Sequence, residues 1–594
     1  MHRKRRTVPL LIAVVLALLM PRSTPALAAG STISLDRGSY TQGQTLTVTY
    51  ATDQVSSTNW VGIYTSTGKP GSVGSLMWKY TPGSSGTVSF ATSSLAPGSY
   101  TAHYLYNDGY TELATPVPFT VTAPTAGSNL IVNGDAEFAD ASTSGYDGVT
   151  IPGWQVTGVP TIVGYTVGNG FPTAQTPGPA NRGNQFFAGG PVGTSTLTQT
   201  VDVSAAASAI DGGGVGYTLS GWLGGYASED SRTTVTITFR NGSGSALRTA
   251  QIGPVTAADR NNTTSLLQRS SSATVPAGTR SVGVVVQLKG TTMRDNLNQY
   301  DDAYADNLSL TFATNLPAAG APSVPPSSVP AFDHVFFTML ENRSYDQVIG
   351  NSAAPYLSQL ASANVALAQS YGAVHPSDPN YMAVAGGSTF GHTDNPYPGG
   401  IGTIDAPHIG DSVEAAGKTW KGYIEDMGTN CNRTSSGYFD VDNLPFLFFK
   451  NIANDDTRCR AHLQPVSQFW TDLQATSTTP NFVWFEPNTC NTMHSCSTST
   501  GDTWFKNNLP RLFASPAWTQ QRSLLIITFD EDDSSHGQRI PTIVVGSPGT
   551  VKTGYTSQSH YTHYSVSRTM ETALGLPTLT RNDGYANPVN DVWR

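Results

Sequence analysis

Four uninterrupted apolar runs follow residue 330, and they restrict the fold of this region more than any other sequence feature. They are His334–Leu340, Asn481–Phe485, Leu524–Phe529 and Thr542–Val545. A strand that is apolar on both faces must be covered on both, as in parallel sheets. Helical patterns lie between the runs, over Tyr356–Ala363, Asp411–Ala416 and Thr503–Phe513. This alternation predicts an α/β domain over residues 331–594, with a mainly parallel sheet between helices.

Residues 30–122 show a different pattern, in which short alternating runs such as Leu46, Val48 and Tyr50 are separated by Gly- and Pro-containing turns. Such spacing is typical of an immunoglobulin- or fibronectin III-like β-sandwich. Trp60, Trp78 and Tyr110 could bind sugar or polymer, but we interpret them as core aromatics.

Residues 126–313 are predicted to form a second all-β domain. Its two ends, Asn129–Glu137 and Ala305–Leu310, resemble the first and last strands of the galactose-binding-like jelly rolls that accompany secreted enzymes. Asp135, Glu137 and Asp306 could hold a structural calcium ion, although we favour their interpretation as solvated strand ends. Residues 314–330 are rich in Pro, Ala and Ser and predict a semi-rigid linker.

The first 28 residues have the pattern of a secretory signal peptide, with a basic start, the apolar run Val8–Met20 and small residues before the expected cleavage site. No segment is long enough to predict a membrane span. Residues 1–28 carry five basic and no acidic residues, so their removal lowers the formal net charge from −9 to −14. This acidic balance argues against nucleic acid as a partner. We therefore expect a secreted protein, on whose acidic surface any phosphorylated substrate would have to be held by a local site.

All four cysteines, Cys431, Cys459, Cys490 and Cys496, lie after residue 430. In an oxidising compartment they favour two disulfides over a metal site. The simplest pairing is Cys431 with Cys459 and Cys490 with Cys496, but four cysteines allow three pairings.

Two of the apolar runs end in acidic or amide residues. Glu341 and Asn342 follow the first run, and Asp530 and Glu531 follow Leu524–Phe529. If the strands are parallel, these side chains meet at one edge of the sheet, where a divalent cation would relieve the repulsion between carboxylates. The alternative is a helix cap at Glu341 and an exposed acidic turn after Phe529.

Ser377 is the candidate nucleophile. Pro379 fixes φ where a helix can begin, so a helix starting near Asn380 would leave Ser377 just ahead of unpaired backbone N–H groups. A hydroxyl at that place, beside a cation, could attack phosphorus. The alternative is a serine that caps a surface helix.

Histidines are the candidates for proton transfer, because imidazole titrates near neutral pH. His494 lies in a loop that a Cys490–Cys496 bridge would hold rigid, and His563 opens a predicted helix over Tyr564–Leu576. The weaker candidates are His375, His392, His408 and His560.

Residues 332–580 resemble the phosphoesterase family of bacterial phospholipases C and secreted acid phosphatases, within the alkaline phosphatase superfamily. Among these they are most similar to small secreted acid phosphatases, some of which act on phosphatidylinositol 3-phosphate. The resemblance lies in Glu341–Asp346, His375–Gly387, Gly422–Asp426, Pro487–His494, Gly501–Trp504, Thr528–Asp533 and His563–Pro577.

The resemblance implies that Ser377 is a nucleophile that forms a phosphoserine. Glu341, Asn342, Asp530 and Glu531 match the family's ligands for one divalent metal of unknown identity, with His494 and His563 lining the phosphate pocket. The sequence also departs from the family. A segment that often reads Lys-His-Asn-Pro is Asp442–Pro445 here, and the usual acidic neighbours of His494 are Thr492 and Ser495. Because the family's histidine is absent from this segment, the resemblance does not identify the general acid. Because the acidic neighbours of His494 are absent, it does not imply a second metal ion either.

The leading hypothesis is a secreted, metal-dependent acid phosphatase that acts on phosphoinositides or other organic phosphates. One alternative is a phospholipase C-type phosphodiesterase with the same site. Another is a non-catalytic secreted protein whose β domains bind carbohydrate or a cell-surface ligand.

Overall fold

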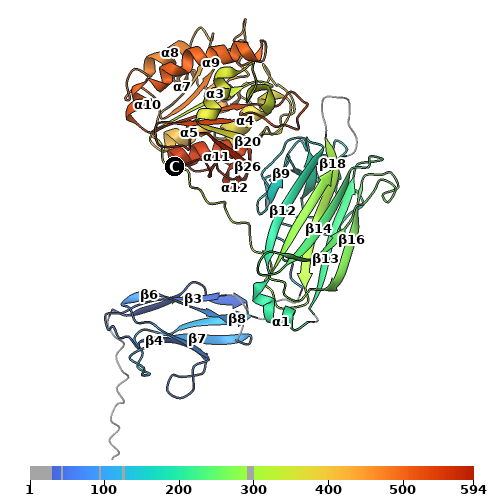
Figure 1. The fold of residues 1–594 in the computed structure, drawn as a ribbon, viewed down its shortest axis with the longest axis vertical. Coiled ribbons are helices and arrows are strands. Elements are labelled where there is room, and N and C mark those ends of the chain that lie inside the picture. The colour runs from blue at the N-terminus through green and yellow to red at the C-terminus, as the bar shows by residue number, and fades with distance from the viewer. Residues whose placement is uncertain (1–29, 42–44, 93–94, 123–126, 214, 291–299) are drawn as a thin grey trace, which may run out of the picture. The chain divides into compact units, whose positions relative to one another are not determined.

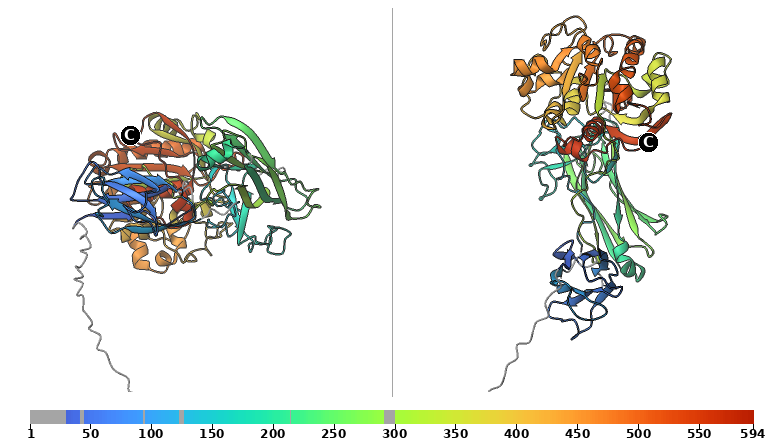
Figure 2. Two further views of the ribbon diagram at one scale, coloured as in Figure 1. Left: turned by 90° about the horizontal axis from the view of Figure 1, so that it is seen from below. Right: turned by 90° about the vertical axis from the view of Figure 1, so that its left-hand side faces the viewer.

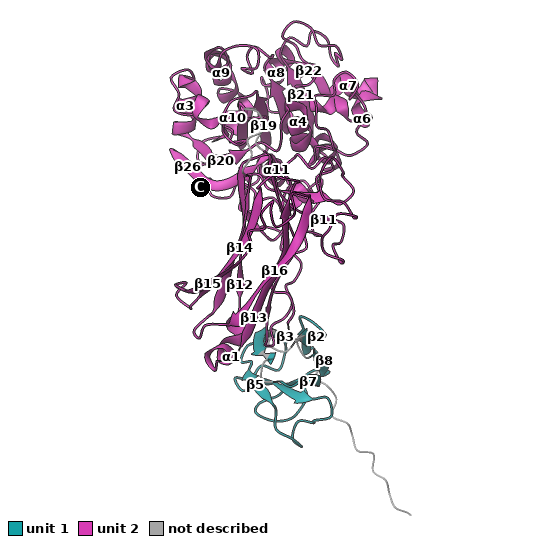
Figure 3. Ribbon diagram, turned by 90° about the vertical axis from the view of Figure 1, so that its right-hand side faces the viewer, with its two compact units in different colours: residues 1–124 teal, residues 125–594 magenta. Residues whose placement is uncertain are grey.

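The computed structural model describes residues 30–594 except 42–44, 93–94, 123–126, 214 and 291–299 (Figure 1). The proposed signal peptide, residues 1–28, lies outside the described residues. The chain divides into two compact units, residues 1–124 and 125–594 (Figure 3). None of the helices in the described ranges is long and apolar enough to cross a bilayer.

The first unit is a β-sandwich. A three-stranded sheet, β1-β3-β6, lies with a five-stranded sheet, β2-β8-β7-β4-β5. The core between them contains Leu46 and Val48 of β3 and Val61 and Ile63 of β4, which are alternate residues along each strand. The strands are β1 Thr32–Leu35, β2 Ser39–Thr41, β3 Thr45–Ala51, β4 Trp60–Thr65, β5 Met77–Tyr80, β6 Ser85–Ala91, β7 Gly98–Leu105 and β8 Val117–Thr122.

The interpretation of the three aromatics as core residues is wrong for two of them. Trp60 is buried, but Trp78 is 53% exposed and Tyr110 is 58% exposed. Trp78 lies on β5, the edge strand of its sheet, beyond which no further strand pairs among the described residues.

The second β region consists of two five-stranded sheets, β10-β11-β18-β13-β16 and β15-β14-β17-β12-β9. Alternate side chains of β14 are buried, as expected for a sheet with one face on a core. The strands are β9 Gln155–Thr157, β10 Thr161–Gly164, β11 Gln185–Gly190, β12 Thr194–Asp202, β13 Gly216–Gly225, β14 Arg232–Arg240, β15 Ala246–Ile252, β16 Ser265–Thr274, β17 Ser281–Lys289 and β18 Asp301–Phe312. Between β12 and β13 lie η2 Ser204–Ala206 and α1 Ala207–Asp211.

The expected first strand of this region is not formed. Residues 129–137 are turns, because Asn133 and Ala136 have positive φ values of 47° and 63°. The segment still lies along β18, through Leu130 N to Leu310 O and Leu308 N to Gly134 O, both at 2.8 Å.

The C-terminal part is the predicted α/β fold, and the predicted order of two β domains followed by an α/β domain is confirmed. Its eight-stranded sheet has the order β22-β21-β23-β19-β24-β25-β20-β26 and is parallel except at β25. The strands are β19 His334–Leu340, β20 Val365–Tyr371, β21 Trp420–Ile424, β22 Leu463–Pro465, β23 Phe482–Glu486, β24 Ser523–Phe529, β25 Ile543–Gly546 and β26 Tyr555–Thr562.

Helices cover both faces of this sheet (Figure 1 and Figure 2). Val335 and Phe337 of β19 enter one apolar cluster, whereas Phe336 and Leu340 enter another. The helices are α2 Tyr345–Val348, α3 Pro355–Ala363, α4 Ser377–Gly386, α5 Ile409–Ala415, η3 Pro445–Phe448, α6 Lys450–Ala453, α7 Asp456–His462, α8 Val466–Asp472, α9 Thr498–Phe513, α10 Pro516–Gln520, α11 His563–Leu574 and α12 Arg581–Tyr585.

Two disulfides join the loops at this end of the chain. They link Cys431 with Cys459 and Cys490 with Cys496, the simplest of the three pairings.

His560, on β26, hydrogen-bonds to the second β region and is kept neutral by its surroundings. Its Nε2 donates to Gly158 O at 2.7 Å, and its ring stacks on Tyr371. Burial lowers the pKa of His560 from 6.5 to about 4. The contribution of neutral His560 to stability is therefore complete above pH 6.5 and is lost as the pH falls toward 4.

We expect the stability difference between wild type and His560→Gln to depend on pH. Glutamine can still donate to Gly158 O but does not titrate, so acidification from pH 7 to 4.5 should cost wild type about 2 kcal/mol more than the variant. Urea unfolding at both pH values measures this. An equal loss in the two proteins would contradict the assignment.

Candidate active site

Two neighbouring parallel strands bring the predicted acidic residues together. β19 and β24 run in register, with Leu340 opposite Phe529, so the residues that follow each strand emerge at the same sheet edge. Asn342 joins the two segments: its backbone N donates to Asp530 Oδ1 at 2.9 Å, and its Nδ2 donates to Glu531 Oε1 at 2.6 Å.

Helix α4 brings Ser377 to the same place. Ser377 Oγ donates to Glu341 Oε2 at 3.1 Å and lies 3.5 Å from Glu531 Oε1. The helix begins at Ser377 itself, not near Asn380, because a proline in the first turn removes an N–H that has no helical partner there. Ser377 thus lies within the first turn, 8% exposed.

The three carboxylates at this edge are buried and unscreened. Glu341, Asp530 and Glu531 are at most 5% exposed. Burial, and then repulsion from Glu341 and Glu531, raises the pKa of Asp530 well above its usual range. Asp530 Oδ2 is buried without a hydrogen-bond partner. Hard oxygen donors with an unsatisfied buried oxygen fit a divalent cation.

His375, one of the weaker candidates, lies against this cluster. Its Nδ1 is 2.6 Å from Glu531 Oε2, and its Nε2 is 2.9 Å from Asp532 Oδ1. Burial alone would lower its pKa, but the hydrogen bonds to Asp532 and Glu531 outweigh burial and raise the pKa to about 9. His375 therefore holds Glu531 in place and partly neutralises it.

Residues that sequence reasoning missed hold the other oxygen of Glu341. Tyr381 OH donates to Glu341 Oε1 at 2.6 Å, and Asn443 Nδ2 donates to the same oxygen at 2.7 Å. Tyr381 OH also lies 3.3 Å from Glu486 Oε1. Glu486 ends a buried strand, β23, just as Glu341 follows β19, so the same strand-end rule could have found it.

The two histidines expected in the phosphate pocket lie in different environments. His563 is fully buried: Nε2 donates to Phe529 O at 2.8 Å, next to Asp530, and Nδ1 has no partner. Burial lowers its pKa to about 4. His494 is exposed, and its hydrogen bond is to Ser495 Oγ at 3.2 Å. Among the described residues, no hydrogen bond or ion pair joins His494 to Ser377 or to the carboxylates.

Further acidic residues surround Ser377. Burial, followed by the charges of Asp442 and Glu341, raises the pKa of Asp378 to about 9. Asp378 is 1% exposed, and its Oδ2 has no partner. Burial likewise raises the pKa of Asp442 to about 7. The sequence analysis assigned no role to either residue. It noted Asp378 only as the neighbour of Ser377, and Asp442 only as part of the segment that departs from the family pattern.

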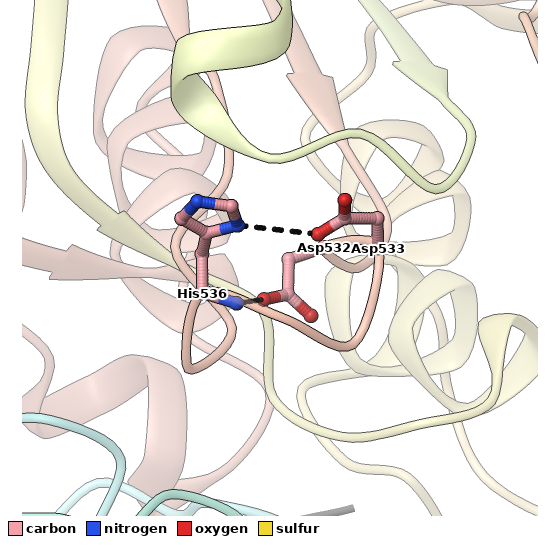
Figure 4. A group of neighbouring side chains, drawn as sticks. All are labelled: Asp532, Asp533 and His536. Carbon is pink, nitrogen blue, oxygen red and sulfur yellow. Dashed lines mark hydrogen bonds and ion pairs between the residues drawn. The ribbon is translucent and has the colours of Figure 1, made fainter. Parts of the chain in front are cut away.

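A second group near the same edge also has metal-ligand spacing. Asp532, Asp533 and His536 place ligand atoms within 4.8 Å of one another (Figure 4). The Asp533 oxygens, however, accept hydrogen bonds from Ser344 Oγ at 2.5 Å and Gln347 Nε2 at 2.6 Å. Its ligand oxygens are therefore already satisfied, in contrast to Asp530 Oδ2.

The calcium candidates in the second β region lie near one another. Burial raises the pKa of Asp306 to about 7, and the charges of Glu137 and Asp135 add to this. Asp306 accepts hydrogen bonds from Tyr165 OH at 2.7 Å and Asn307 N at 2.6 Å. Calcium there stays a prediction.

Comparison with known proteins places this chain in a family. The phosphoesterase family profile matches residues 351–577. The phosphatidylinositol-3-phosphatase of Mycobacterium tuberculosis is 34% identical over 274 residues, which cover 45% of this chain and 85% of that protein. The chain belongs to the phosphoesterase family. This phosphoesterase is accordingly a hydrolase that acts on phosphoric esters.

Other similarities are more partial. The phosphate-repressible acid phosphatase of Penicillium chrysogenum is 30% identical over 46% of this phosphoesterase and 66% of its own length. A solved structure of an alkaline phosphatase superfamily protein from Vibrio parahaemolyticus is 11% identical, covers 44% of this chain and 71% of that one, and has a TM-score of 0.31. A score this low adds nothing to the sheet topology described above.

Repulsion within the carboxylate cluster predicts a stability effect. Asp530→Asn removes one buried charge while keeping an oxygen for Asn342 N–H, so it should stabilise the metal-free protein by about 1 kcal/mol or more. Thermal unfolding in excess chelator measures this. A lower melting temperature than wild type would contradict the repulsion argument.

Proposed function

We propose that this phosphoesterase is a secreted, metal-dependent phosphomonoesterase that works through a phosphoserine at Ser377. The observation that carries the proposal is the position of Ser377 Oγ, 3.1 Å from Glu341 in a buried cluster of three carboxylates. The names of the matched relatives, acid phosphatases and a phosphatidylinositol-3-phosphatase, support phosphoinositides or other organic phosphates as substrates.

The residues that would hold one divalent metal are Glu341, Asn342, Asp530, Glu531 and Ser377. Their carboxylate, amide and hydroxyl oxygens suit a hard cation. When bound, the metal would lower the pKa of the serine hydroxyl and neutralise charge on the phosphoryl oxygens. The metal's identity is left to experiment.

In the proposed reaction, Ser377 Oγ attacks phosphorus and the bond from phosphorus to the leaving alcohol oxygen breaks. Glu341 Oε2 already accepts a hydrogen bond from this hydroxyl, so an acceptor for its proton is in place. Water then attacks the phosphoserine, which releases phosphate and restores the serine. His563 stays neutral above about pH 5, given its pKa near 4, and is proposed to assist proton transfer.

The roles proposed for the signal peptide, the β domains and His494 come from the sequence analysis. Residues 1–28 are proposed to direct secretion, and the β domains to hold a carbohydrate or cell-surface ligand. The loop that carries exposed His494 borders the carboxylates, because Glu341 N donates to Thr492 O at 3.0 Å, and this supports the proposed place of His494 in the phosphate pocket.

Replacing the nucleophile tests the proposal directly. Ser377→Ala should lower turnover of p-nitrophenyl phosphate at least about 1,000-fold, because the covalent route is removed. Ser370→Ala, a buried serine on β20 that bonds Thr542, is the matched control and should keep turnover. Acid quenching and mass spectrometry should find phosphate on Ser377 of the wild type. Undiminished turnover by Ser377→Ala would refute the mechanism.

Chelation tests the metal and its ligands. We expect chelator to abolish hydrolysis and one divalent cation to restore it in the wild type and in Asp533→Asn, but not in Asp530→Asn. The reason is that the Asp533 oxygens are already hydrogen-bonded, whereas Asp530 Oδ2 is not. Restoration of hydrolysis in Asp530→Asn but not in Asp533→Asn would contradict this assignment and indicate that the metal binds at Asp532, Asp533 and His536.

The substrate class needs a separate comparison. Rates on p-nitrophenyl phosphate, bis-p-nitrophenyl phosphate, phosphatidylinositol 3-phosphate and phosphatidylcholine distinguish a monoesterase from a phospholipase C-type diesterase. Faster cleavage of the diesters would favour the diesterase.

A further inference from the structure

The second β region contacts the α/β domain at the segment that carries Ser377. Both belong to one compact unit, residues 125–594 (Figure 3). Gly148 N donates to Ala373 O at 2.8 Å. Ala373 precedes Ser377 by four residues, so this bond holds the chain just before the nucleophile helix α4. An added Cβ at Gly148 would lie 2.2 Å from Val159 Cγ1, so packing within the second β region favours glycine at this position.

A buried hydrogen bond holds the chain just after α4. Thr389 Oγ1 donates to Asp147 Oδ2 at 2.8 Å, and both residues are 2% exposed. The other oxygen, Asp147 Oδ1, accepts from Ser144 Oγ at 2.8 Å and from Ser142 Oγ. Asp147 is therefore fixed within its own domain, and Thr389 bonds to a rigid acceptor.

A third connection reaches the C-terminal end of α4 through one intermediate. Thr150 N donates to Asn582 Oδ1 at 3.2 Å, and Asn582 Nδ2 donates to Gly387 O at 3.2 Å. Gly387 ends α4 with a positive φ of 73°. Three contacts from residues 147–150 thus meet the chain on both sides of the helix that begins at Ser377.

We propose that residues 147–150, the clamp loop, position Ser377 against the carboxylates, so that the second β region is a working part of the active site. The inference rests on the proposed role of Ser377. The clamp loop touches neither Ser377 nor the carboxylates and acts through Ala373, Gly387 and Thr389. A nucleophile displaced by about 1 Å can lose a hundredfold in rate, so support at both ends of α4 matters for turnover.

The decisive variant is Thr389→Val in the full chain. It removes the hydroxyl and leaves Asp147 Oδ2 buried without its donor, which should loosen α4. We expect kcat for p-nitrophenyl phosphate to fall about tenfold with KM within twofold, and Thr389→Ser to restore it. Hydrogen exchange of peptides covering residues 373–389 should rise in Thr389→Val.

The matched control is Thr233→Val, which removes a buried hydroxyl that is bonded to Tyr304 O inside the second β region and not to the clamp loop. It should lower the melting temperature without changing kcat or exchange of residues 373–389. If Thr389→Val changes kcat and the hydrogen exchange of residues 373–389 no more than this control does, the proposal that the clamp loop positions Ser377 is refuted. An inactive wild type would instead overturn the proposed function, while the exchange measurement would still decide whether the clamp loop restrains α4.

Discussion

The structure of this phosphoesterase depends on three carboxylates that are buried together at the ends of two parallel strands. Each has one oxygen held by a fixed donor: Asn342 N on Asp530, Asn342 Nδ2 on Glu531, and Tyr381 on Glu341. The donors orient the groups without removing their repulsion, and burial together with this repulsion keeps the pKa of Asp530 raised. Such an arrangement is unstable by itself and is suited to a cation.

The surrounding fold bears the cost of this repulsion. Strands β19 and β24 are each apolar along their length and contribute side chains to cores on both faces of the sheet. Such burial is the dominant source of stability in a domain. It allows the strand ends to hold charged groups in an order that would not persist on a flexible loop.

The β region before the α/β domain adds to this framework. The family profile matches residues 351–577, which lie within the α/β domain, so the second β region lies outside the part of the chain that the profile describes. In this chain, α4 also lies between hydrogen bonds from Asp147 and Gly148. The helix that carries Ser377 and the second β region are therefore connected by specific hydrogen bonds, beyond the covalent linker.

Much of the fold could be predicted because it follows from local patterns. The uninterrupted runs indicated the buried strands to within about a residue, and the alternation of β14 is typical of a one-sided sheet. Errors arose where local pattern and packing diverge. Trp78 is exposed because β5 is an edge strand, and residues 129–137 are turns because Asn133 and Ala136 adopt positive φ.

The sequence by itself determined which strands are buried, where carboxylates follow them, and that a helix begins close to Ser377, although it placed that start near Asn380, three residues too late. These features depend on neighbouring residues and on periodicity. Only the tertiary structure decided that Tyr381 and Asn443 hold Glu341, that His375 rather than exposed His494 meets the cluster, and that Asp147 bonds Thr389. Those pairs are brought together by sheet order and domain packing, which bring into contact residues up to 242 positions apart and leave no local pattern in the sequence.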